Sequence, residues 1–351
     1  MGFPTGDGGK SSSSSKPEGN IRPTDERVEE IKSTIMLEDL VFDVPGGPKV
    51  GMVGESKSGK TVSSISSVFM NKEFIPSLME AGLVNVADAL KHNIIPNVKR
   101  VVIIDTENAI KTQLSYPYER NMFTSVGDRI KRIGVDIPAL KEAVDSDTEE
   151  VNYDMVSVEE VTKAMDDIIA AVEWCVDNLD REDVIIFDSA SDYQVLLHIV
   201  TGFIANLKAR KTTDSDEKTE FRYNRWTNRT SLWSASMRKL RSFPGWVFTT
   251  FKKKRNKKWI IKAFNKPLLE PLWLEGTEYN YDMVYDFSIE RNTNVRIVEP
   301  MEGRYVNTDN PDFDRVEIYG KIEGEEDKYQ FLKVIDNMLA IQKGGRSEWQ
   351  I

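Results

Sequence analysis

Cysteine and histidine are almost missing from this chain of 351 residues, which holds one cysteine and two histidines. The lone Cys175 excludes internal disulfides and any metal site built from several thiolates, and such usage is typical of a reducing compartment. His92 and His198 are too few for a histidine-rich metal centre, and they disfavour a nucleophilic site of the cysteine–histidine kind.

Long apolar runs and an excess of positive charge are also absent. No segment approaches the roughly 20 apolar residues that a membrane helix requires. Residues 1–20 lack the apolar core of a signal peptide, so we expect a cytoplasmic protein with no membrane partner. The formal net charge of −10 disfavours nucleic-acid binding over the whole surface, although a local basic patch can still provide it.

The composition predicts three regions along the chain. Residues 1–26 are rich in glycine and serine and cannot bury enough apolar surface to offset their ordering entropy, so we expect a disordered tail. Residues 27–299 are expected to form the main globular core, and residues 300–351 a C-terminal extension.

Apolar β-branched runs alternate with helical patterns through the core. Ser157 and Glu160 form a capping-box pattern at the start of a helix that the spacing of apolar residues continues to residue 179. Such alternation predicts an α/β fold with a mostly parallel sheet flanked by helices, followed by antiparallel C-terminal strands and a closing helix. The expected strands are 49–53, 100–104, 183–187, 246–250, 283–289, 295–298 and 315–319, and the closing helix is 329–342.

A complete phosphate-binding loop follows the first of these strands. Residues 54–61 fit the pattern G-x-x-x-x-G-K-[ST], in which glycines let successive backbone N–H groups turn toward phosphate oxygens. Lys60 is expected to reach the β- and γ-phosphates of ATP, and the Thr61 hydroxyl is expected to bind Mg²⁺. The expected nucleotide contacts are Gly54, Glu55, Ser56, Lys57, Ser58, Gly59, Lys60, Thr61 and Val62.

Carboxylates end two other apolar strands. Because ligands of open α/β sheets bind at the carboxyl ends of the strands, we expect Asp188 and the loop to converge, with Asp188 as a second Mg²⁺ ligand. Glu107 stands one step beyond another strand and is the candidate base that activates water. Asp105 would then be a supporting residue for Glu107.

These motifs resemble those of RecA-type ATPases. Residues 103–109 resemble the strand whose D-x-E glutamate is the catalytic base, and residues 185–191 resemble the Walker-B strand. Residues 223–226 and 240–250 are similar to RecA-core ATPases of phages and archaeal viruses, in which a strand closes on a polar sensor. The resemblance spans about residues 45–295. It implies a RecA-like P-loop fold with Lys60, Glu107, Asp188 and Thr249 as catalytic residues, Thr250 being the alternative sensor. We find neither the glutamine sensor nor the DNA-binding loops of bacterial recombinases, so strand exchange is not implied.

Two basic segments bear on partners. Residues 252–258 are expected to form a hairpin whose tip contacts nucleic acid, or which reaches the γ-phosphate of a neighbouring subunit, or which is only a solvated turn. Residues 208–233 interleave cations with aromatic rings, which suits single-stranded nucleic acid or a helix that buries its tryptophans. The basic residues of the first segment are Lys252, Lys253, Lys254, Arg255, Lys257 and Lys258.

The sequence as a whole predicts a Mg²⁺-dependent ATPase that acts in DNA metabolism, of viral or mobile-element type, on single-stranded DNA and as a homo-oligomeric ring or filament. If it is viral, its compartment is the cytoplasm of the host cell. Two other classes stay open at this point: a KaiC-like nucleotide switch that does not bind DNA, and a packaging motor.

Overall fold

The computed structural model describes residues 47–137, 152, 155–211, 215–261, 266–274, 277–290, 295–303, 316–319 and 330–344. Internal contacts divide the chain into residues 1–43 and 44–351, and every described residue belongs to the second unit. The glycine- and serine-rich tail expected for residues 1–26 lies outside the described residues.

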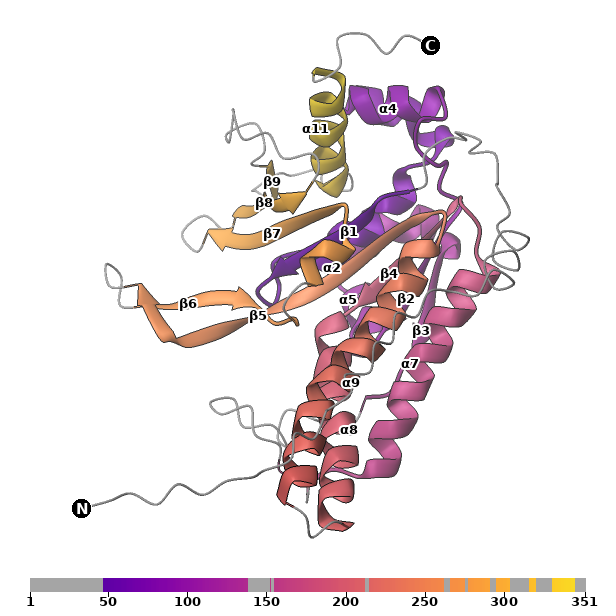
Figure 1. Ribbon diagram of the computed structural model, residues 1–351. Helices are drawn as coiled ribbons and strands as arrows, with labels where there is room; N and C mark the ends of the chain where they lie inside the picture. Colours follow the sequence, from indigo (N-terminus) through magenta and orange to yellow (C-terminus); the bar gives the residue numbers. More distant parts are fainter. Residues whose placement is uncertain are drawn as a thin grey trace, which may run out of the picture. The chain divides into compact units, whose positions relative to one another are not determined.

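A single nine-stranded sheet organises the described part of the chain (Figure 1). Six neighbouring strands run parallel, in the order β3, β2, β4, β5, β1 and β7. β8 and β9 continue the sheet antiparallel beyond β7, and β6 pairs antiparallel with the outer part of β5. The strands are β1 (Lys49–Gly54), β2 (Arg100–Asp105), β3 (Ile130–Gly134), β4 (Asp183–Asp188), β5 (Trp246–Ile261), β6 (Lys266–Pro271), β7 (Met283–Glu290), β8 (Val295–Gly303) and β9 (Val316–Tyr319).

The expected fold class, a mostly parallel sheet with antiparallel C-terminal strands, is confirmed. Three strands differ from expectation. β3 and β6 are additional strands, and β7, which was expected among the antiparallel strands, pairs parallel with β1 while β8 pairs antiparallel with β7. A connection of four residues, 291–294, separates β7 from β8, and so short a connection suits antiparallel neighbours only.

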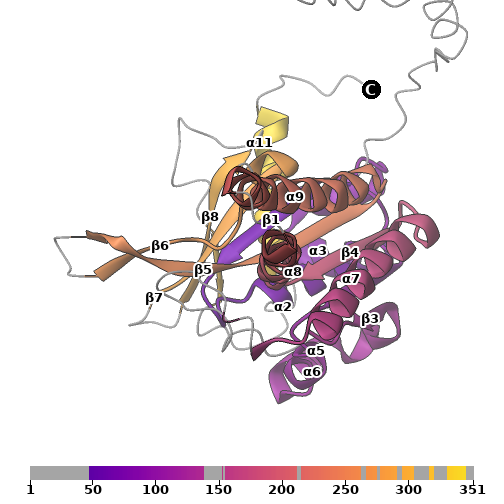
Figure 2. The same ribbon diagram turned by 60° about the horizontal axis from the view of Figure 1, so that its bottom comes forward.

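Helices cover both faces of the sheet, and the strands supply alternate side chains to each. Along β4, Val184 and Ile186 pack in one hydrophobic cluster while Ile185 and Phe187 pack in the other, as the two-residue period of a strand requires. On the first face lie α2 (Lys60–Ile65), α3 (Ile75–Glu80), α4 (Val84–Lys91) and α11 (Gln330–Gly344). On the second lie α7 (Val158–Asn178), α8 (Ala190–Lys211) and α9 (Ser215–Ser242), which run side by side in Figures 1 and 2.

The start of α7 predicted at Ser157 is confirmed. The helix begins after Ser157, whose hydroxyl accepts from the backbone N–H of Glu160 at 3.3 Å.

Trp233 of α9 is 2% exposed and packs against Tyr193 in the second cluster, so this tryptophan belongs to the core rather than to a nucleic-acid surface. The side chains of residues 206–226, which carry most of that cation and aromatic pattern, lie outside the description.

The closing helix α11 packs into the core of the first face. Phe331 makes edge contacts with Phe248 of β5 and Tyr285 of β7. Asp336 is buried and accepts hydrogen bonds of 2.9 Å from the backbone N–H of Val86 and the amide of Asn85. The helix α11 therefore contributes to the same core as the strands that precede it.

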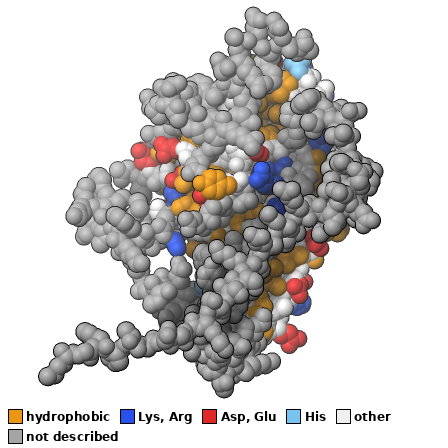
Figure 3. All heavy atoms as spheres, in the orientation of Figure 1, with side chains coloured by type: hydrophobic (Ala, Val, Ile, Leu, Met, Phe, Trp, Pro, Cys, Tyr) orange, Lys and Arg blue, Asp and Glu red, His pale blue; other side chains and the backbone are white. Residues whose placement is uncertain are grey.

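The described surface has a mixed character. On the face shown in Figure 3, the described acidic and basic side chains are interspersed, without one extended patch of a single sign. No helix among the described residues is long and apolar enough to cross a membrane.

Candidate functional site

The loop between β1 and α2 is shaped by two glycines. A Cβ on Gly54 would lie 2.5 Å from the carbonyl oxygen of Phe287 and 2.6 Å from the Ser58 hydroxyl, so only glycine fits there. Gly59 has a φ of 95°, the left-handed region that favours glycine, immediately before Lys60 starts the helix. The strand, loop and helix predicted around this motif are therefore present.

Lys60 lies folded against the loop that carries it. Its ammonium group donates to the carbonyl oxygens of Gly54 at 2.9 Å and Glu55 at 2.8 Å. The side chain is buried, and this burial lowers the pKa of Lys60 to about 8, although the carboxylates of Asp188 and Glu107 act in the opposite direction. A cation held this way is positioned to pair with phosphate oxygens.

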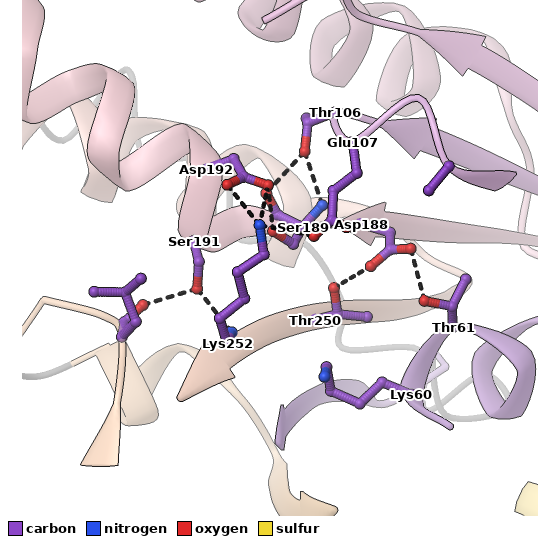
Figure 4. Close-up of polar contacts among 12 residues, drawn as sticks. Lys60, Thr61, Thr106, Glu107, Asp188, Ser189, Ser191, Asp192, Thr250 and Lys252 are labelled. Atoms are coloured by element: carbon purple, nitrogen blue, oxygen red, sulfur yellow. Dashed lines mark hydrogen bonds and ion pairs between the residues drawn. The ribbon is translucent and has the colours of Figure 1, made fainter. Parts of the chain in front are cut away.

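Asp188 ends β4, and its carboxylate faces the hydroxyl groups of Thr61 and Thr250 (Figure 4). The Thr61 hydroxyl donates to one carboxylate oxygen at 2.8 Å, and the Thr250 hydroxyl makes a very short hydrogen bond to the other. Burial raises the pKa of Asp188, Glu107 raises it further, and the two hydroxyl donors oppose the shift. The convergence expected for Asp188 and Thr61 is thus observed in the geometry.

The polar residue that β5 brings to Asp188 is Thr250 and not Thr249. Neighbouring side chains of a strand point to opposite faces, so only one of the two threonines can reach the carboxylate. Thr249 is fully buried, and it does not line the cavity described below. The preference for Thr249 as the sensor is therefore corrected in favour of Thr250.

Glu107 is held in place by the short segment that follows β2. Asp105, fully buried, accepts from the backbone N–H groups of Glu107 at 3.2 Å and Ile110 at 3.3 Å, and from Arg132 at 2.6 Å. The supporting position expected for Asp105 is thus seen in the geometry. Thr106 ties the segment to β4, because its hydroxyl accepts from the Ser189 N–H at 2.8 Å.

Lys252 joins Glu107 to a carboxylate that sequence analysis missed. Its ammonium lies 2.9 Å from Glu107 and 2.7 and 2.8 Å from the two oxygens of Asp192, in the first turn of α8. Burial acts to raise the pKa of Glu107, but the Lys252 ammonium outweighs it and the net pKa is lowered. An acidic residue in the first turn after the Asp188 strand was the available signal for Asp192.

Lys253, the next residue of β5, pairs with Asp286 in the middle of β7 at 2.6 Å. The basic run is therefore divided: Lys252 and Lys253 face the cavity within their own chain, and neither lies at a hairpin tip. Lys254 is partly buried. The prediction of a hairpin with its tip at residues 252–258 was wrong: these residues lie within β5, which pairs antiparallel with β6 in a hairpin that projects past the sheet in Figure 1. The side chains of Arg255, Lys257 and Lys258 on it lie outside the described residues.

One cavity of about 630 Å³ lies at the carboxyl ends of the parallel strands, and Lys252 and Lys253 are among the residues that line it. Residues 56–62 of the loop and its helix, Val62 included, form one wall, and Glu107, Asp188 and Thr250 face them. Tyr116 lines the cavity from the segment after β2, and Arg296 lines it from β8. Arg296 also donates to the carbonyl oxygen of Lys57 at 2.9 Å, a contact that depends on strand register and could not be read from spacing. No group of three or more metal-binding His, Cys, Asp or Glu side chains occurs within the described ranges.

Comparisons with known proteins show a likeness in structure only. No family model matches the chain, and no curated protein matches it. A crystal structure of the RadB recombinase is similar over 78% of this chain and 87% of that one, with 11% sequence identity and a TM-score of 0.35. This likeness is too distant to indicate a function.

Proposed function

We propose that this protein binds ATP with Mg²⁺ and hydrolyses it at a site of RecA type. One observation carries the proposal: Lys60, the Thr61–Asp188 pair and Glu107 converge on one cavity although they lie at the carboxyl ends of three different strands or just beyond them. Phosphoryl transfer needs positioning and charge neutralisation more than covalent chemistry, and these are what such a set of residues offers.

The residues divide the chemistry among them. Lys60 pairs with oxygens of the β- and γ-phosphates, and the backbone of the loop holds the chain of phosphates in place. Glu107 takes a proton from a water molecule as the water oxygen bonds to the γ-phosphorus. The bond from that phosphorus to the bridging oxygen breaks, and ADP and inorganic phosphate leave. Thr250 orients the Asp188 carboxylate through its hydrogen bond.

Thr61 and Asp188 fit a magnesium ion. Their two oxygens are 2.8 Å apart, and neighbouring ligands of an octahedral Mg²⁺ at about 2.1 Å are separated by about 3 Å. Mg²⁺ characteristically takes one or two protein oxygens and completes its shell with phosphates and water. When bound, the ion neutralises charge on the phosphate oxygens, and the protein's part is to orient these two ligands.

Exchange of the loop lysine tests the nucleotide site. Lys60→Ala should abolish ATP binding or turnover, measured as equilibrium binding of labelled ATP and as phosphate release. Lys239→Ala is the matched control, because Lys239 pairs with Asp177 at 3.1 Å and does not line the cavity. Unchanged binding and turnover in Lys60→Ala would remove the basis of the proposal.

We further propose that hydrolysis serves DNA metabolism, with single-stranded DNA as partner and a homo-oligomer as the working form. The resemblance of the motifs supports this, as does the basic sequence that continues along the β5–β6 hairpin beyond the cavity. The viral or mobile-element origin follows from the same resemblance, and regulation by nucleotide without DNA is the rival reading.

Single-stranded DNA should stimulate ATP hydrolysis, and the stimulation should fade as salt rises because phosphate contacts release counterions. The double variant Lys257→Glu/Lys258→Glu should lose the stimulation while basal hydrolysis continues. Lys91→Glu/Lys131→Glu changes the charge equally at exposed lysines elsewhere and should keep it. Absence of DNA binding at low salt would favour the nucleotide switch.

A further inference from the structure

The Lys252 ammonium is shared by two carboxylates that belong to different elements. Glu107 follows β2 and Asp192 lies in α8, and both contact the same nitrogen at 2.7 to 2.9 Å (Figure 4). The three side chains are only partly exposed, at 27% for Lys252, 35% for Glu107 and 22% for Asp192. In this arrangement the carboxylate of Glu107, the candidate base, is paired with the ammonium of Lys252.

The backbone of Lys252 is fixed independently of its ammonium. Its N–H donates to the Ser191 hydroxyl at 2.9 Å, and that hydroxyl donates to the carbonyl oxygen of Leu272 at 2.9 Å. The ammonium ends a flexible chain of four carbons, so it can change partners while β5 stays in place. Lys252 also lines the cavity together with Lys60, and this is the cavity in which we propose that the phosphates bind.

Electrostatics favour an exchange of partners. Burial acts to lower the pKa of Lys252, but Asp192 and Glu107 outweigh it and the net pKa is raised, so the side chain stays charged. Two carboxylates around one ammonium leave an excess negative charge. A terminal phosphate carries more charge than either carboxylate and is a strong competitor for the same cation.

We propose that Lys252 detects the terminal phosphate of a nucleoside triphosphate within its own subunit and thereby controls Glu107. Without nucleotide, the ammonium is divided between Glu107 and Asp192. When a triphosphate binds, the ammonium moves to the terminal phosphate oxygens, and Glu107 is released to accept a proton from water. Asp192 is a positioning residue, because it sets how firmly Lys252 is held back. This inference rests on the proposed nucleotide site, and Lys253 cannot replace Lys252 because its partner is Asp286.

Affinities for ATP and for ADP measured side by side test the inference, because only ATP has the terminal phosphate. Lys252→Met should reduce the preference for ATP over ADP by about tenfold, the size of one charge-assisted hydrogen bond, with ADP affinity nearly unchanged. Asp192→Asn should shift the preference in the opposite direction, since it removes one competitor for the ammonium. If Lys252→Met does not fold, Lys252→Gln serves the same purpose.

A double variant separates partner exchange from a structural brace. In Lys252→Met/Asp192→Asn, the change at Asp192 should have no further effect on the preference, because Asp192 acts through Lys252. Asp177→Asn removes a carboxylate on α7 that pairs with Lys239, and it should leave the preference for ATP over ADP unchanged. An ATP to ADP preference that is the same in wild type and Lys252→Met would overturn the inference while leaving the ATPase intact. A wild-type protein that binds neither nucleotide would overturn both proposals.

Discussion

The burial of Lys60 predicts that nucleotide affinity depends on pH in alkaline solution. Its pKa in the nucleotide-free protein is lowered from 10.5 to about 8, with burial as the main cause. At about 1.4 kcal/mol per unit, keeping this lysine charged costs the free protein about 3 kcal/mol below pH 8. The fold is relieved of that cost as pH rises from 8 to 10.5, because there the unfolded chain binds the extra proton.

Nucleotide binding reverses the shift, since phosphate oxygens favour the charged ammonium. ATP should therefore bind tightly below pH 8 and lose about tenfold in affinity for each pH unit above it, as Lys60 must take up a proton to bind. Lys252 does not contribute to this loss, because its pKa is raised.

Calorimetric titration of ADP between pH 7 and 9.5, in buffers of different ionisation enthalpy, measures both the affinity and the proton uptake. The expected result is about one proton taken up per nucleotide near pH 9. Lys60→Arg is the control: arginine stays charged in this range, so its affinity should be independent of pH even if it is weaker. A flat pH profile in the wild-type protein, with no proton uptake, would refute the reasoning.

Two other substitutions test single contacts. Thr61→Val removes a hydroxyl that pairs with Asp188 at 2.8 Å. The variant should need an Mg²⁺ concentration about tenfold higher or more for half-maximal hydrolysis, with little change in nucleotide affinity measured without Mg²⁺. An unchanged Mg²⁺ requirement would exclude Thr61 as a ligand. Arg132→Met leaves the buried Asp105 without its cation. Denaturant unfolding should show a free energy of unfolding that is lower by about 1–3 kcal/mol, whereas Lys131→Met at the exposed neighbouring residue should change it very little. Equal losses in the two variants would show that the Arg132–Asp105 ion pair does not stabilise the fold.

The sequence was a good guide where local chemistry dictates structure. The loop of residues 54–61 carries its own conformational requirements, and Gly54 and Gly59 meet them wherever the strand lies. Asp188 and Glu107 could be placed near it because each ends a buried strand and parallel strands share one carboxyl edge.

Contacts that depend on register between distant strands could not be predicted. Thr249 and Thr250 are equivalent in sequence, and only the pairing of β5 with β4 and β1 decides which one faces Asp188. Lys252 was grouped with the charges that follow it, although β5 continues without a break from the cavity into the hairpin. Arg296 donates to the loop from a strand more than 200 residues further along the chain, and no sequence spacing predicts such a contact.

Glu107 is proposed to activate water at a site that binds ATP through other residues. The most direct test of this proposal mixes excess protein with labelled ATP and Mg²⁺ and follows the bound nucleotide, in the wild type and in Glu107→Gln. We expect the wild type to convert bound ATP to ADP, while the variant binds ATP at least as well and hydrolyses it about 10²- to 10⁴-fold more slowly. Turnover preserved in Glu107→Gln would contradict the proposal.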